Sequence, residues 1–296
     1  MGASTRIAAI PRFGRAALGL TVDRWALVVV PGLVFLAVVF LYPLAEILLR
    51  SVNDPPNAGA KNYLDFFQTE SDVRILRNTF WIAGLSTLTT LLIGYPYAYL
   101  MTIVRPRIAG LLLIAVLLPF WSSLLVRTFA WQVILRDTGI INTMLRGMGI
   151  GEVGLIRTTP GVIIGMSHVL LPFMVLPLYA VMRRIDPEYL RAAANLGASP
   201  RRAFLRVFVP LSAPGVVAGV LLVFILALGF YITPALLGGP RDTMISQLIV
   251  QRIQQQLDWG DGSAMAALLT ALTLVLLFVA SRLVRLRDAF GSALED

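Results

Sequence analysis

The chain has 296 residues, of which 57% are hydrophobic and only 14% charged, and its mean hydropathy is +0.80. Soluble domains carry about 25% charged residues, so this composition is typical of a membrane protein. Cysteine is absent and His168 is the single histidine, which excludes disulfides, cysteine nucleophiles and multi-histidine metal sites. The net charge of +9 comes from arginines beside apolar runs, which indicates contact with anionic headgroups of a lipid bilayer rather than with nucleic acid.

The first half of the chain predicts three membrane spans. Residues 1–24 carry four arginines and no apolar run long enough to cross a bilayer. The run at 25–49 exceeds the core of a signal peptide, so we expect a retained first span. A second span is predicted at 80–104, interrupted by the glycine and the proline of 94–97. A very short turn then leads to a third span at 109–126, antiparallel to the second.

The second half predicts three more spans. An interfacial helix is expected near 139–148, followed by a fourth span at 162–182. The fifth span, at 215–237, begins with a Gly-x-x-x-Gly spacing that lets helices approach closely. The sixth span is expected at 264–284. Together these spans form a predicted transmembrane domain over 25–287.

Basic residues predict the orientation of the six spans. The segments 1–24, 105–107, 183–206 and 282–287 hold 15 basic residues, whereas the alternate segments, which are longer in total, hold 10. The positive-inside rule therefore places both termini in the cytoplasm, including a tail at 288–296. The fold class that follows is an all-α membrane protein with six transmembrane helices.

The loop at 185–210 is the longest polar interval in the second half of the chain. Asp186 followed by Pro187 is a strong helix start, because the carboxylate caps free amides and proline needs no partner there. Gly197 provides a left-handed helix end, and Ser199 with Pro200 repeats the start signal. The pattern predicts two short helices with a glycine turn between them, presented as a contact surface.

Several classes of chemistry are excluded or disfavoured. The only lysine, Lys61, precedes Asn62, so the chain has no phosphate-binding loop that ends in Gly-Lys-Ser or Gly-Lys-Thr. His168 has no acid in a neighbouring span to orient it, which favours a packing hydrogen bond over catalysis. Asp258 and Asp261 are interpreted as acids of a solvated outer loop. A membrane enzyme or scaffold is therefore the weaker alternative to a transport function.

The loop resembles a signature of permease subunits in ABC-type importers, Glu-Ala-Ala-x(3)-Gly-x(9)-Ile-x-Leu-Pro. The matching positions are Ala192, Ala193, Gly197, Val207, Val209 and Pro210, with Arg191 in place of the glutamate. Within this family the chain is most similar to the spermidine/putrescine group, on the segments 196–199, 210–215, 233–240 and 258–260. Glu188, one turn before Arg191, is the candidate replacement for the missing glutamate.

The resemblance implies a type I importer permease fold whose cytoplasmic coupling helix docks on a separate ATPase dimer. It also implies a second, similar permease subunit and an extracytoplasmic solute-binding protein, in a bacterial inner membrane. ATP would be bound by the ATPase, so no cofactor is expected on this chain. The expected coupling residues are Glu188, Tyr189, Arg191, Ala192, Ala193, Leu196, Gly197 and Pro210.

Tyr189, Ala193 and Leu196 share one helical face and form a low apolar ridge. A helix lying on the bilayer surface would also have apolar and basic faces, but it does not explain the alanine–glycine–proline spacing.

The substrate path is expected where polar or aromatic side chains lie beside helix breaks. The candidates are Tyr95, Trp121, Ser122, Tyr231 and Thr233. Aromatic faces attract cationic amines, which suits a polyamine cargo. Ferric iron, an opine or an amino-acid derivative remains an alternative cargo of the same importer class.

Overall fold

The computed structural model describes residues 24–54 and 59–292, and its chain forms helices without a strand in these ranges. Most of the predicted N-terminal segment 1–24 and the last residues of the predicted tail 288–296 lie outside the described residues. The chain divides into two units, 1–46 and 47–296. Within the first unit, α1 (Arg24–Leu36) continues through the π turn η1 (Ala37–Leu41) into the start of α2 (Tyr42–Asn53).

The second unit contains all the remaining helices. They are α3 (Lys61–Gln68), α4 (Glu70–Ile103), α5 (Pro106–Leu117), η2 (Leu118–Trp121), α6 (Leu124–Leu135), α7 (Ile140–Gly147), α8 (Thr159–Met182), α9 (Pro187–Asn195), α10 (Pro200–Ala203), η3 (Phe204–Phe208), α11 (Val209–Leu228), α12 (Ile232–Leu237), η4 (Pro240–Asp242), α13 (Ile245–Val250), η5 (Gln251–Gln255) and α14 (Trp259–Ser292).

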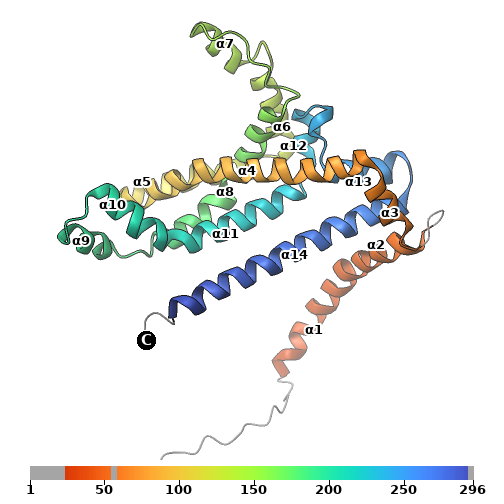
Figure 1. Ribbon diagram of the computed structural model, residues 1–296, viewed down its shortest axis with the longest axis horizontal. Helices are drawn as coiled ribbons and strands as arrows, with labels where there is room; N and C mark the ends of the chain where they lie inside the picture. Colours follow the sequence, from red (N-terminus) through yellow and green to blue (C-terminus); the bar gives the residue numbers. More distant parts are fainter. Residues whose placement is uncertain (1–23, 55–58, 293–296) are drawn as a thin grey trace, which may run out of the picture. The chain divides into compact units, whose positions relative to one another are not determined.

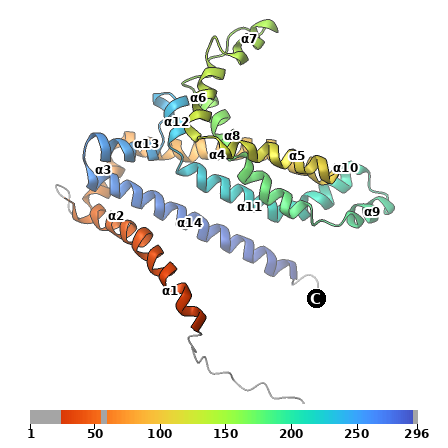
Figure 2. The ribbon, with the colours of Figure 1, turned by 180° about the vertical axis from the view of Figure 1, so that it is seen from behind.

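Three helices form the core of the second unit. The helices α4, α8 and α11 pack on one another and lie side by side in both views (Figure 1 and Figure 2). Met174 of α8 lies at the centre of this bundle. A β-carbon at Gly94 of α4 would meet Met174 Cγ at 2.9 Å, and one at Gly219 of α11 would meet its Sδ at 2.7 Å. The close approach predicted from Gly215 and Gly219 is therefore confirmed, since these glycines let α11 pack directly on α8.

Four described helical segments are long and apolar enough to cross a membrane: Val29–Asn53, Thr159–Met182, Pro200–Leu228 and Trp259–Arg282. A fifth candidate is the pair Pro106–Trp121 and Leu124–Gly147, which is bent by 101°. Helix α4 has 34 residues, about 51 Å, which is ample for a hydrocarbon core of about 30 Å. It is not among these candidates because it is rich in threonine and tyrosine. The count of six spans stays a prediction.

The polar side chains of α4 are satisfied inside the protein. Thr87 donates a hydrogen bond to the Ala83 carbonyl at 2.7 Å, and Thr90 donates one to the Ser86 carbonyl at 2.6 Å. Ser86, Thr87 and Thr90 are all buried. Helix α4 is thus an inner helix whose buried hydroxyl groups donate hydrogen bonds to carbonyls of the same helix.

The structure corrects three predicted boundaries. Helix α4 runs through Pro96 without the predicted interruption, because Gly94 and its neighbours pack tightly on α8. The third predicted span, 109–126, is not one helix, since Ser122 and Ser123 are extended and the chain turns after Pro119. The fifth, 215–237, ends at Leu228, and α12 is a separate short helix.

Candidate functional site

The loop between α8 and α10 has the cap geometry that the sequence predicts. Asp186 Oδ1 accepts a hydrogen bond from the Glu188 amide at 2.9 Å, which caps the start of α9. At its end Gly197 has a φ of +83°, and its amide donates to the Ala194 carbonyl at 2.9 Å. The Ala198 amide donates to the Ala193 carbonyl at 3.0 Å, which completes a Schellman motif. The predicted helix–glycine–helix arrangement is confirmed.

Helix α9 presents an apolar ridge to its surroundings. Leu196 is 90% exposed and Tyr189 is 57% exposed, and Ala192 lies exposed between them. Leu190 packs against the core, and Ala193 is half-buried beside it. The ridge therefore consists of Tyr189, Ala192 and Leu196, whereas Ala193, predicted to belong to it, lies at its inner edge.

The charges around this ridge are mostly positive. Arg191 Nη1 lies 2.6 Å from Glu188 Oε1, so the arginine at the position of the family glutamate is paired with the acid one turn earlier. Five further arginines on the same loop and its flanks are exposed: Arg183, Arg184, Arg201, Arg202 and Arg206. Pro210 is exposed in the first turn of α11. The loop is an apolar surface in a basic setting, at the opposite end of the bundle from α3 and α13 (Figure 1).

The predicted path residues do not converge on one site. Tyr95 and Ser212 join α4 to α11 through a hydroxyl–hydroxyl contact of 2.9 Å. Thr233 is buried, 3.4 Å from the Thr128 hydroxyl, and connects α12 to α6. Tyr231 is 41% exposed and lines a separate pocket. These three residues therefore lie in three different environments.

The other two path candidates lie at the bend between α5 and α6. Trp121 is 81% exposed, and the Ser122 hydroxyl donates to the Pro119 carbonyl at 2.8 Å. Arg127 Nη2 donates to the Ser122 carbonyl at 3.3 Å, and its Nε is buried without a partner among the described residues. The bend is thus stabilised by local hydrogen bonds that the sequence pattern did not predict.

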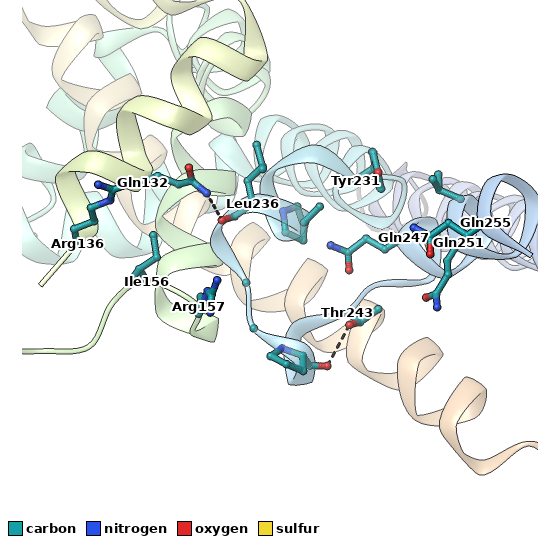
Figure 3. A pocket seen from close by; sticks show the side chains of 16 residues that line it. Gln132, Arg136, Ile156, Arg157, Tyr231, Leu236, Thr243, Gln247, Gln251 and Gln255 are labelled. Atoms are coloured by element: carbon teal, nitrogen blue, oxygen red, sulfur yellow. Dashed lines mark hydrogen bonds between the residues drawn. The ribbon is translucent and has the colours of Figure 1, made fainter.

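One pocket of the described chain has a volume of about 810 Å³ and several polar side chains in its lining (Figure 3). It is bounded by α6, the segment before α8, α12 and the α13–η5 helix. Its polar side chains are Gln132, Arg136, Arg157, Tyr231, Thr243, Gln247, Gln251 and Gln255. None of the described residues that line it is acidic. Gln132 is fixed by a 2.7 Å hydrogen bond from its Nε2 to the Leu236 carbonyl.

A buried aspartate holds the loop that forms one wall of this pocket. Asp242 is 4% exposed; its Oδ2 accepts from the Gly239 amide at 2.9 Å, and its Oδ1 accepts from the Thr159 hydroxyl at 2.5 Å. Gly239 permits the approach, because a β-carbon there would lie 2.6 Å from the Arg157 carbonyl oxygen. Asp242 thus ties the wall to the first turn of α8, where the helix dipole also favours a negative charge.

Glutamines at i, i+4 and i+8 are the pocket signal that the sequence analysis missed. Gln247, Gln251 and Gln255 have this spacing and all line the pocket. Arg136 and Arg157 come from distant parts of the chain, so no local pattern groups them with the glutamines. Folding alone brings the two sets together.

Two interpretations of isolated polar residues are also settled. His168 Nδ1 accepts a hydrogen bond from Trp131 Nε1 at 3.2 Å, which confirms its packing role.

The interpretation of Asp261 as a solvated loop acid is wrong. Its Oδ2 lies 3.0 Å from Arg252 Nε, and the same arginine contacts Asp72 at 3.2 Å. The acid lies in the first turn of α14, and Asp258 accepts from its amide at 3.0 Å.

Comparisons with known proteins agree with this architecture. The spermidine/putrescine transport system permease protein PotB of Haemophilus influenzae is 38% identical over 259 residues, covering 85% of this chain and 87% of that protein. PotB of Escherichia coli K12 is 34% identical over 214 residues, covering 72% and 78%. A chain from the crystal structure of a bacterial alginate ABC transporter, in complex with an alginate pentasaccharide-bound periplasmic protein, has the same fold, with a TM-score of 0.72 at 19% identity, covering 88% and 94%. The family model for binding-protein-dependent transport system inner membrane components matches residues 25–289. The chain is therefore a multi-pass inner membrane protein and belongs to this family of transport permeases.

Proposed function

We propose that this chain is the permease subunit of an ATP-driven importer for polyamines such as spermidine and putrescine. It would pair with a second permease of similar kind, and it would receive cargo from an extracytoplasmic solute-binding protein. ATP would be bound and hydrolysed by a cytoplasmic ATPase dimer, because the sequence has no nucleotide-binding loop of its own. The polyamine cargo is supported by the names of the two relatives, both at least 34% identical over more than two thirds of the chain.

The observation that carries the proposal is the exposed ridge of α9. Leu196 is 90% exposed, and exposing its apolar side chain to water is unfavourable. The caps at both ends of α9 fix the ridge in position, so the ridge suits a groove on another protein. The small Ala192 between Tyr189 and Leu196 lets such a groove approach the α9 backbone closely. The coupling residues in this proposal are those of the ridge, with Glu188 and Arg191 as an internally paired rim and Gly197 as the turn.

A continuous helix connects this ridge to the other end of the bundle. The segment Pro200–Leu228 has 29 residues, about 44 Å, and it runs from the Gly197 turn through η3 and α11. It ends next to Phe230, whose carbonyl accepts from the Ser246 hydroxyl at 2.5 Å, and Tyr231, which lines the pocket. Movement of α9 by an ATPase would therefore be transmitted to the pocket wall along one continuous helical segment.

A bulky substitution on the ridge tests the coupling role. Ala192→Trp places a large side chain where a groove would seat, and we expect it to reduce ATP-dependent uptake at least tenfold with normal membrane insertion. Ala194→Trp is the matched control, because Ala194 is also exposed but lies about 200° around the helix. Uptake and ATP hydrolysis would be measured in proteoliposomes that contain the assembled transporter. Equal effects of both substitutions would contradict docking on the ridge.

The cargo is tested in the same proteoliposomes. Radiolabelled spermidine and putrescine should accumulate only when ATP, the ATPase and the binding protein are all present. Uptake by this chain alone would refute the importer mechanism. Competition by a ferric complex, an opine or an amino-acid derivative, without competition by polyamines, would refute the polyamine cargo and leave the importer class intact.

A further inference from the structure

We infer that the 810 Å³ pocket is the seat for an acidic segment of the solute-binding protein, and not a binding site for the cargo. This inference rests on the proposed function, because it takes the binding protein as the partner. It adds which surface of this chain the partner contacts and what chemistry it must bring. The argument depends on the charge, the hydrogen-bonding capacity and the position of the lining residues.

The charge of the pocket selects an anionic occupant. Arg136 and Arg157 both line it, both are exposed, and neither has an ion pair among the described residues. Elsewhere in the described chain, arginines such as Arg252 and Arg146 lie within 3.2 Å of a carboxylate. The nearby Asp242 does not line this pocket, and its carboxylate is buried and bonded to the Gly239 amide and the Thr159 hydroxyl. Two guanidiniums without an ion pair therefore create a positive potential in the pocket. A guanidinium binds a carboxylate with paired hydrogen bonds, so acidic side chains are its natural partners.

The backbone conformation of Arg157 indicates that contacts with the surrounding residues hold this arginine in place at the pocket. Arg157 has a φ of +58°, in the left-handed region that non-glycine residues rarely adopt. Its amide donates to the Leu237 carbonyl at 2.8 Å, which ties the residue to the wall of the pocket. Strained residues of this kind persist only where the surrounding contacts fix them, and they concentrate at functional positions.

The remaining polar groups suit a protein segment. The side-chain amides of Gln251 and Gln255 are exposed and have no hydrogen-bond partner among the described residues. Gln247 uses its Oε1 to accept from the Met244 amide at 2.9 Å, which leaves its amide nitrogen as a donor. Figure 3 shows these three side chains along one wall, facing the side that carries Arg157. Amides that both donate and accept can pair with an exposed backbone, while the arginines bind its acidic side chains.

A polyamine is a poor occupant for the same reasons. Spermidine and putrescine are polycations, and a lining with two guanidiniums and no carboxylate would repel them. The pocket also adjoins the end of α11 opposite the α9 loop. If α9 contacts a cytoplasmic ATPase, the pocket faces the side from which the binding protein approaches.

The test measures how much binding protein is needed for half-maximal uptake by the complete transporter in proteoliposomes. The probe is the solute-binding protein that supports uptake by the unmodified transporter. Arg136→Glu combined with Arg157→Glu should raise this concentration at least tenfold, because each substitution replaces an attraction by a repulsion. Arg241→Glu is the matched control: Arg241 is exposed on the same loop but lines neighbouring hollows, so the concentration should stay unchanged.

A crosslinking measurement keeps the inference testable if the double variant folds poorly. The sequence has no cysteine, so Gln251→Cys introduces a single thiol in the pocket and Arg241→Cys a single thiol outside it. A short thiol-to-carboxylate crosslinker should join Gln251→Cys to the binding protein, and the control should react at least fivefold less. Equal crosslinking at both positions would overturn the inference.

The outcomes separate the inference from the proposed function. If uptake by the unmodified transporter does not require a binding protein, both fail. If uptake requires it but the double arginine variant needs no more of it, or no more than the Arg241→Glu control needs, only the inference fails. If the double variant changes the KM for spermidine at saturating binding protein instead, the pocket contacts the cargo and the inference is wrong.

Discussion

Replacing Gly197 by alanine should weaken coupling between this permease and its ATPase without disturbing the membrane bundle. Gly197 ends α9 with a φ of +83°, and a β-carbon there would meet no other atom within 4 Å. The cost of alanine is therefore purely conformational, about 1–2 kcal/mol for a left-handed non-glycine residue.

This cost should appear almost fully in docking. Helix α9 has nine residues, none of them buried, and isolated helices of this length are marginal in water. Its order depends on the Asp186 cap and on the Schellman bonds that Gly197 makes possible. Since about 1.4 kcal/mol corresponds to a factor of ten, we expect the ATPase to bind about 5- to 30-fold more weakly.

The measurement is the ATPase concentration that half-saturates uptake in reconstituted vesicles. Gly151→Ala is the matched control, because Gly151 has a φ of +85° and equally open space but lies outside the α9 loop. It should carry the same backbone strain and leave ATPase binding unchanged. The reasoning is refuted if both variants weaken ATPase binding equally, or if Gly197→Ala has no effect.

Two further predictions follow from the pocket wall and from the orientation of the chain. Asp242→Asn should lower the free energy of unfolding by about 1–3 kcal/mol, because the charged acceptor of two hydrogen bonds is lost. Thermal unfolding in detergent measures this loss. The control is Asp137→Asn at an exposed position, and a similar loss of stability in this control would contradict the prediction. In an otherwise cysteine-free chain, Leu196→Cys should react with a membrane-impermeant maleimide only in inside-out vesicles, and Gln255→Cys only in right-side-out vesicles. Labelling of both from one side would overturn the assigned orientation.

Local signals in the sequence predicted the α9 loop well. Asp186, Pro187 and Gly197 act through contacts with residues two to five positions away, so their effect can be read without knowing the fold. The Gly215 and Gly219 spacing likewise predicted a close helix contact, although not that Met174 would fill it.

Features that depend on distant parts of the chain could not be predicted in this way. Pro96 suggested a break in α4, but packing of Gly94 on α8 keeps the helix continuous. Asp261 looked like a loop acid because its partner, Arg252, is recognisable only once the η5 turn places it there. The pocket arginines are separated by 21 residues in sequence and join glutamines almost a hundred residues further on, so only the folded bundle defines their shared charge.

The π turn η3 has a consequence for how this permease can change over evolution. A π turn contains one residue more than an α turn, and each residue of an α-helix rotates the chain by about 100°. Inserted between α10 and α11, the extra residue sets the angular phase of the α9 ridge relative to the face of α11 that packs on α8. Loss or gain of one residue at 204–208 would turn the ridge about the helix axis, and it would also shift Phe204 and Phe208, whose rings pack on Tyr99 of α4. A single-residue insertion or deletion would thus present the ridge to a differently oriented ATPase groove, with repacking confined to the contacts of Phe204 and Phe208 at this end of the bundle.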